Sequence, residues 1–121
     1  MTQKANSKPY DLEDRTFEFA KKVREFVKKL PKITANFEDG KQLIRASGSV
    51  GANYIEANES LGKKDFVLSI KICRKEAKES EYWLKLIDPD SHPDQEKERK
   101  ELEGEARELM NIFGSILRKS Q

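Results

Sequence analysis

The sequence contains little of the chemistry on which most enzymes depend. Its 121 residues include a single cysteine, Cys73, and a single histidine, His92. One cysteine excludes a disulfide within the chain, and a lone thiol is typical of a reducing compartment. Cys73 lies on an apolar helical stripe, which favours a small core residue over a nucleophile. His92 stands in a proline-flanked turn, so serine or cysteine hydrolase chemistry has no histidine base in the core.

Proline, glycine and long apolar runs are also scarce. The chain has four prolines and six glycines, and it contains no Gly-rich phosphate-binding loop. No run approaches the roughly 18 apolar residues of a membrane span, and residues 1–9 lack the apolar segment of a signal peptide. We therefore expect a soluble cytoplasmic protein without a membrane partner and without a cofactor.

Charged residues, in contrast, are abundant. They make up 38% of the chain, yet the net charge is only +2, and so small a charge does not by itself indicate a nucleic-acid binder. Abundant lysine, glutamate, arginine and leucine with little proline or glycine favours long helices. A chain of this length fits one domain. We expect residues 1–9 to be a disordered N-terminal tail and residues 10–121 to form that domain.

Apolar residues repeat with a spacing of three and four along four segments, which predicts four amphipathic helices. The first helix is expected to begin near Asp11 and to end before Pro31. The second is expected to begin between Asn36 and Lys41 and to end at Gly62. The third is expected over about 63–87 and the fourth over about 94–118. Phe17 is expected to widen the apolar face of the first helix. Residues 95–101 are almost wholly charged and are expected to project into solvent or fray. Short connections between the helices predict an all-α, antiparallel up-down-up-down four-helix bundle.

The second predicted helix has two apolar faces. One stripe, which includes Leu43, faces the core, and a second stripe consists of Ile44, Gly48, Gly51 and Ile55. A helix that is apolar over so much of its circumference is usually buried on two sides. Glycines on such a face permit the close approach of another helix. We therefore predict that these four residues form the interface of a homo-oligomer.

The third predicted helix carries a basic stripe. The stripe comprises Lys71, Arg74, Lys75, Lys78 and Lys85, with Tyr82 beside them. Cations in a line can follow a phosphate backbone, and an aromatic ring among them can stack on a base. The alternative is a solvated face on which lysines pair with glutamates, as Lys75 with Glu79 or Lys78 with Glu81 would.

Polar residues of the second and third helices form a candidate network. They are Arg45, Asn53, Glu56, Glu76 and Glu79. This set matches either a catalytic carboxylate cluster or a paired polar layer that fixes helix register or subunit order, and we favour the structural interpretation. Di-metal helix bundles use Glu-x-x-His pairs. Because the single histidine lies in a turn, we expect no metal site and no catalytic residues.

Short motifs along the chain together resemble a known family. Residues 10–13 (YDLE) open the first helix and residues 30–32 (LPK) close it. Residues 42–47 (QLIRAS) lie in the second helix, residues 79–84 (ESEYWL) in the third and residues 112–116 (IFGSI) in the fourth. In this order and spacing, they resemble the four-helix-bundle family of 23S ribosomal RNA intervening-sequence proteins.

The resemblance implies a small cytoplasmic bacterial protein that assembles into a ring, commonly a homopentamer, and has no established enzymatic activity. A related protein, the accessory variability determinant of retroelements, works with a reverse transcriptase and binds nucleic acid. We therefore predict a non-enzymatic, pentameric bundle that binds RNA through its basic surface, or instead an RNA-associated protein such as a reverse transcriptase-like partner. The alternative is a protein-only oligomeric scaffold that does not bind nucleic acid.

Overall fold

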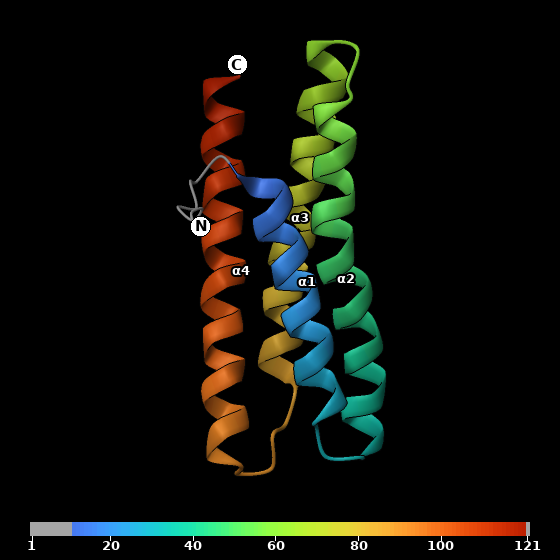
Figure 1. Cartoon of the computed structure of the whole chain (residues 1–121), viewed down its shortest axis with the longest axis vertical. Helices are drawn as coiled ribbons and strands as arrows, with labels where there is room; N and C mark the ends of the chain where they lie inside the picture. The colour runs from blue at the N-terminus through green and yellow to red at the C-terminus, as the bar shows by residue number, and fades with distance from the viewer. Residues whose placement is uncertain (1–10, 121) are drawn as a thin grey trace, which may run out of the picture.

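Four helices make up almost all of the structure, a computed structural model that describes residues 11–120. The helices are α1 (Leu12–Lys28), α2 (Thr34–Asn58), α3 (Lys63–Leu86) and α4 (Pro93–Lys119). Each helix runs opposite to the one before it (Figure 1). The predicted all-α four-helix bundle is thus confirmed, while the tail predicted at residues 1–9 lies outside the described residues.

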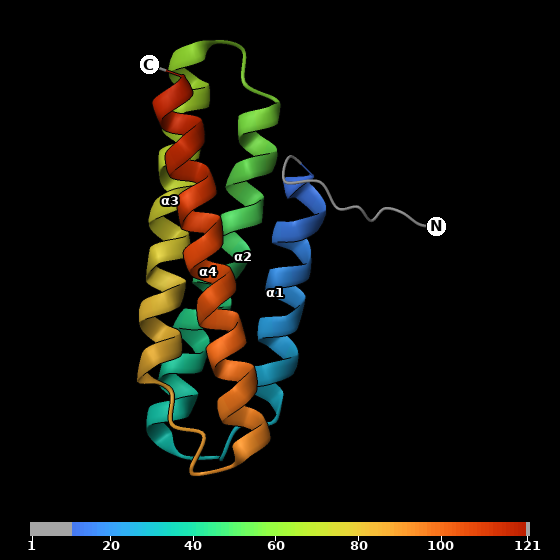
Figure 2. The same cartoon turned by 90° about the vertical axis from the view of Figure 1, so that its left-hand side faces the viewer.

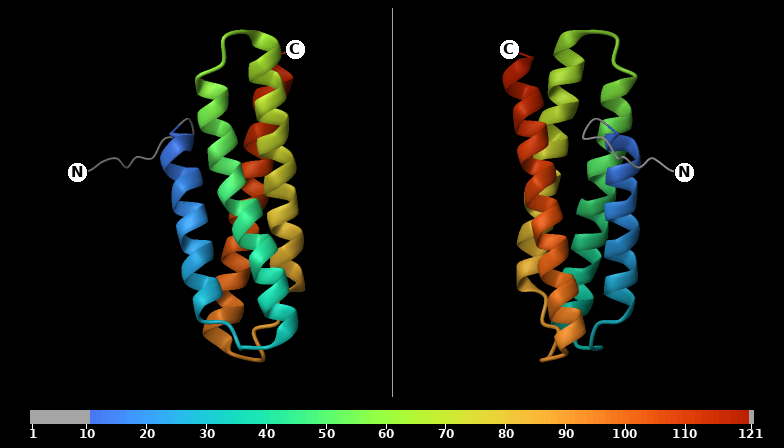
Figure 3. Two further views of the ribbon diagram at one scale, coloured as in Figure 1. Left: turned by 90° about the vertical axis from the view of Figure 1, so that its right-hand side faces the viewer. Right: turned by 60° about the vertical axis from the view of Figure 1, so that its left-hand side comes forward.

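The helices are not equally engaged with one another. Of the four helix pairs that are in contact, α2–α3 and α3–α4 pack most extensively and α1–α4 packs least extensively. The α2–α3 hairpin extends past the start of α1, which is the shortest helix (Figures 1 and 3). The α3 and α4 helices lie side by side along most of their length (Figure 2). The surface between α3 and α4 is therefore a long seam held by a continuous helix contact.

The core follows the predicted helical periodicity. Its largest fully buried side chains include Phe19, Phe26, Phe113, Leu43, Ile70, Leu84 and Leu109. Buried hydroxyl groups bond to their own helices: Thr16 donates to the Leu12 carbonyl at 2.6 Å and Ser80 to the Glu76 carbonyl at 2.9 Å. The predicted placement of Phe17 on the buried face is wrong, because its side chain is 59% exposed.

The starts of α2 and α4 differ from the prediction. Side chains in the first turns of both helices bond to residues that are distant in the sequence. The α2 helix begins at Thr34, earlier than predicted. In its first turn, the Asn36 amide joins α2 to the α3–α4 connection by donating to the Asp88 carbonyl at 2.8 Å and accepting from the Asp88 N–H at 3.0 Å. Residues 95–101 do not fray, although Lys97, Lys100 and Glu101 are exposed to solvent, as the other half of the prediction has it. Gln95 donates to the Lys29 carbonyl at 2.5 Å, and Lys29 pairs with Glu98 at 2.9 Å.

Candidate functional site

A basic groove runs along the seam between α3 and α4. Four predicted residues of the basic stripe, Lys71, Arg74, Lys75 and Lys78, line one side of a groove of about 580 Å³. The α4 helix contributes Met110, Gly114, Leu117 and Arg118. The groove therefore has cationic walls and a largely apolar floor, which is a surface suited to an extended anionic chain.

The cations of this groove are not neutralised by acids among the described residues. Within residues 11–120, none of the groove residues Lys71, Arg74, Lys75, Lys78 and Arg118 forms an ion pair. The two glutamates that could have paired with the lysines are engaged elsewhere. Glu79 accepts from Arg45 at 3.1 Å, and Glu81 pairs with Arg107 of α4. The cations of the groove are therefore exposed and without acidic partners in the described part of the chain.

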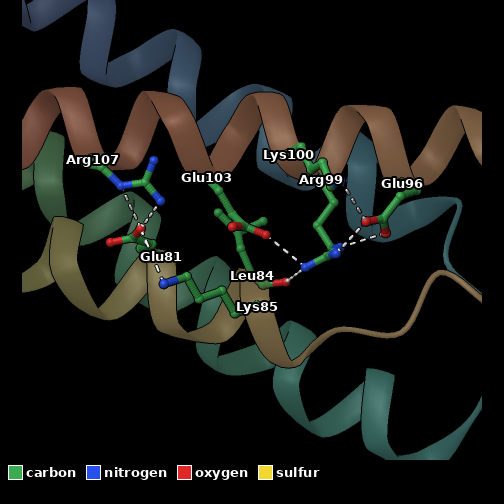
Figure 4. Close-up of polar contacts among 8 residues, drawn as sticks. All are labelled: Glu81, Leu84, Lys85, Glu96, Arg99, Lys100, Glu103 and Arg107. Carbon is green, nitrogen blue, oxygen red and sulfur yellow. Dashed lines mark hydrogen bonds and ion pairs between the residues drawn. The ribbon is translucent and has the colours of Figure 1, made fainter.

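Lys85 does not join the other residues of the predicted basic stripe. It lies outside the groove and pairs with Glu81 at 3.6 Å, and the same carboxylate accepts from Arg107 (Figure 4). The assignment of Lys85 to the nucleic-acid surface stays a prediction. The single carboxylate of Glu81 is shared by Lys85 and Arg107, so it offsets only part of their positive charge.

Arg118 and Tyr82 complete the surroundings of the groove. Arg118 is a groove residue that sequence reasoning missed, because it follows the apolar pattern of α4 and nothing in its local sequence places it beside Arg74. The Tyr82 ring is 58% exposed and meets Trp83 edge-on, with 5.1 Å between ring centroids. Tyr82 follows Lys78 by one helical turn on α3, so an aromatic face lies just beyond the cations.

The glycines predicted at an oligomer interface face α1 of the same chain. A β-carbon on Gly51 would lie 2.9 Å from the Thr16 hydroxyl oxygen, and one on Gly48 would lie 3.4 Å from an Arg24 guanidinium nitrogen. Close helix approach at these glycines is therefore explained within the bundle, without a second copy. The side chain of Ile55, at 51% exposed, still faces solvent.

The exposed apolar surface beside these glycines is broader than the predicted stripe. Between α1 and α2 lies a groove of about 720 Å³, whose lining includes Val27, Ile33, Phe37 and Ile44. Phe37 is 64% exposed and Ile33 is 44% exposed. Phe37 precedes Ile44 by seven residues, so a longer search along the same stripe would have found it. We call this set of apolar residues, together with Ile55, the α1–α2 surface.

The predicted polar network is smaller than the sequence suggested. Arg45 of α2 lies 3.1 Å from Glu79 and 3.5 Å from Glu76 of α3. Asn53 instead donates to the Ser49 carbonyl of its own helix at 2.8 Å, and the exposed Glu56 forms no ion pair within the described residues 11–120. The pairs of Arg45 join α2 to α3 and occupy the two carboxylates.

The single cysteine lies in the core, where it cannot reach a ligand. Cys73 is fully buried, and burial raises the pKa of its thiol to about 12. A thiol with such a pKa carries almost no thiolate near neutral pH, and thiolate is the nucleophilic form. In the part of the chain that the structure describes, no three histidine, cysteine or acidic side chains gather to hold a metal ion.

Comparison with known proteins identifies the family. The profile of the 23S rRNA-intervening sequence protein family matches residues 9–115. The chain belongs to this family. A solved structure from Bacteroides thetaiotaomicron VPI-5482, described as a protein with unknown function from the S23 ribosomal protein family, is 30% identical. The similarity covers 87% of this chain and 96% of the other, with a TM-score of 0.75. No curated protein matches the chain.

Membership of the 23S rRNA-intervening sequence protein family confirms the resemblance seen in the motifs. The related structure, described as having unknown function, supplies the bundle but no activity. None of the helices described here combines the length and the apolar character needed to cross a bilayer. The α3–α4 groove is thus the feature of this family member that points to a role.

Proposed function

We propose that this protein is a non-enzymatic homo-oligomer, expected to be a pentamer, that binds RNA through the basic groove between α3 and α4. The observation that carries the proposal is the set of cations on the groove walls, left without acidic partners in the described part of the chain. The family description, which refers to an intervening sequence of 23S rRNA, agrees with an RNA ligand. The α1–α2 surface supports the oligomeric half of the proposal, because its apolar side chains face water in a single copy.

The groove has the physical properties that RNA binding needs. Lysine and arginine side chains that neutralise phosphates release counterions, which gives affinity without requiring a defined base sequence. Lys71 and Lys78 are separated by seven residues, or about 10 Å along the helix axis, so the groove can follow a short run of backbone. The exposed Tyr82 offers a stacking face one turn further along α3.

A non-enzymatic role is the simplest one for the acidic side chains of α3 and for the single cysteine. Glu76 and Glu79 share Arg45, and the Cys73 thiol is buried among core residues. The lining of the groove consists of lysine, arginine, glycine and apolar side chains, and among the residues that the structure describes it includes no carboxylate, histidine or thiol.

Replacement of three groove lysines tests the RNA half of the proposal. We expect the variant with Lys71→Gln, Lys75→Gln and Lys78→Gln to bind a labelled fragment of 23S rRNA more weakly than the parent in fluorescence anisotropy titrations. Because each lost phosphate contact lowers the dependence of log K on log salt by about 0.7 to 0.9, the slope should fall by about 2. A repeat of the titration at several salt concentrations gives this slope.

A matched variant separates this site from general charge. The control carries Lys22→Gln, Lys32→Gln and Lys97→Gln, which make the same change in net charge at exposed positions outside the groove. We expect the control to keep most of the affinity and of the salt slope. Equal losses in both variants, or no RNA binding by the parent, would overturn the assignment.

A protein-only scaffold is the second candidate, and the α1–α2 surface favours it. Exposed phenylalanine and isoleucine side chains are typical of contacts with other polypeptides. The ratio of absorbance at 260 nm to that at 280 nm, measured after purification at low salt, distinguishes the two candidates. A scaffold leaves the preparation free of nucleic acid, whereas an RNA-binding protein retains some.

A further inference from the structure

We propose that Arg74 and Arg118 form a phosphate clamp over Gly114, in which two guanidinium groups from neighbouring helices grip one phosphodiester of a bound RNA strand. This inference rests on the proposed function, because it names the point in the basic groove at which the RNA backbone is held. It adds Arg118 and Gly114 to the basic stripe predicted from the sequence.

The two arginines converge on one place. A β-carbon on Gly114 would lie 3.5 Å from Nη1 of Arg118 and 3.7 Å from Nε of Arg74. Both guanidinium groups therefore lie within 4 Å of the same point, although Arg74 belongs to α3 and Arg118 to α4. Donors that approach one point from two helices can bind two oxygens of a single phosphate, since a guanidinium presents its N–H groups in a fixed fork.

Within residues 11–120, Arg74 and Arg118 differ from most of the other arginines in having no acidic partner, although Arg24 of α1 has none either. Arg15, Arg45, Arg99 and Arg107 each pair with glutamate, whereas neither Arg74 nor Arg118 forms an ion pair within residues 11–120. Two guanidinium groups held close together repel each other, and an anion between them removes that repulsion. Lys71 and Lys78 on the same wall increase the positive potential at this point.

Gly114 leaves the space that the phosphate would fill. Its position is buried, and the β-carbon of a larger residue would touch both guanidinium groups at ordinary van der Waals distance. Alanine therefore fits the free protein, and its methyl group takes the place of a phosphate oxygen. Gly114→Ala, which retains every charge of the groove, is thus expected to prevent the two arginines from binding a phosphate.

The first test uses inorganic phosphate as the probe on the full-length protein. We expect a saturable shift of the Arg74 and Arg118 Nε–Hε signals in nitrogen–proton correlation spectra when phosphate replaces chloride at constant ionic strength. The Gly114→Ala variant should lose this shift. Gly104→Ala, a glycine substitution on α4 with open space around it, should retain the shift. The clamp would be overturned if no saturable shift occurs, or if the arginines that pair with glutamate shift as much as Arg74 and Arg118.

The second test measures RNA affinity in a double-mutant cycle. Arg74→Gln and Arg118→Gln should each weaken binding by about tenfold, as expected for the loss of a hydrogen bond between charged groups. If both arginines hold one phosphate, the double variant should bind much more tightly than independent, multiplied losses would predict. Arg24→Gln is the control, since Arg24 lies on α1 and donates to the Ala20 carbonyl.

The two tests separate the clamp from the proposed function. If the parent binds RNA but the Arg74 and Arg118 variants behave like Arg24→Gln, the clamp is overturned and RNA binding stands. If phosphate shifts both arginine signals but RNA does not bind, the groove takes free phosphate, and both the RNA assignment and the proposed function fall. Phosphate shifts together with the expected loss of RNA affinity support both.

Discussion

At Gly51 the α1 and α2 helices approach so closely that a side chain has no room. A β-carbon there would lie 2.9 Å from the Thr16 hydroxyl oxygen and 3.3 Å from the Thr16 β-carbon. The hydroxyl is held by its hydrogen bond to the Leu12 carbonyl, and the β-carbon is fixed to the helix backbone. Because neither atom can move aside freely, glycine at this position has a packing role.

Substitution of Gly51 tests this packing role. Alanine is favoured over glycine in a helix by about 1 kcal/mol, whereas overpacking costs about 1–3 kcal/mol. We therefore expect Gly51→Ala to lower the free energy of unfolding by about 1 kcal/mol in urea titrations followed by circular dichroism. Gly104→Ala, with nothing within 4 Å of its new β-carbon, should raise it by about 0.5–1 kcal/mol. Equal effects of the two substitutions would show that α1 moves to accommodate the new methyl group at little cost in stability.

At the scale of single elements, α4 is ordered from its first turn by partners on other elements. Arg99 donates to the Leu84 carbonyl at the end of α3 at 3.3 Å, and it pairs with Glu96 at 2.6 Å and Glu103 at 2.7 Å (Figure 4). The hydrogen bond with Glu96 raises the pKa of Arg99. One arginine thereby satisfies a terminal carbonyl of α3 and pairs with two carboxylates of α4.

Removal of Arg99 tests this connection. We expect Arg99→Met to lower the free energy of unfolding by about 1–2 kcal/mol, because the largely buried Glu103 carboxylate loses its guanidinium partner. Lys100→Met is the matched control, since Lys100 is exposed and lies 3.9 Å from Glu96, and it should change stability by less than about 0.5 kcal/mol. If the two variants unfold at the same urea concentration, the contact of Arg99 does not stabilise α3 and α4.

At the scale of the whole molecule, one side of the bundle is incompletely covered. The α1–α2 surface exposes Phe37 and Ile55, and Phe17 lies exposed on the adjoining helix. Large exposed apolar surfaces mark contacts with other proteins. Association of copies through this surface would bury these side chains without a change in the core.

Charge placed on the α1–α2 surface should prevent such association. We expect Phe37→Glu and Ile55→Glu each to reduce the particle mass measured by light scattering, because a carboxylate would be buried in an apolar contact. Both side chains are more than half exposed in one copy, so circular dichroism spectra should be unchanged. Leu61→Glu, at a 99% exposed residue of the α2–α3 connection, should keep the parent mass. A monomeric parent protein would contradict the predicted assembly.

Periodicity in the sequence was sufficient to predict four helices, most of their buried faces and the line of cations on α3. It could not show what lies opposite each face, because a spacing of three and four residues defines one side of a helix and not its neighbour. Tertiary packing placed α1 against Gly51, brought Arg118 of α4 beside Arg74 and left Lys85 paired with Glu81. The charged start of α4 is ordered for the same reason: its partners lie far away in sequence and come within reach only when the helices pack.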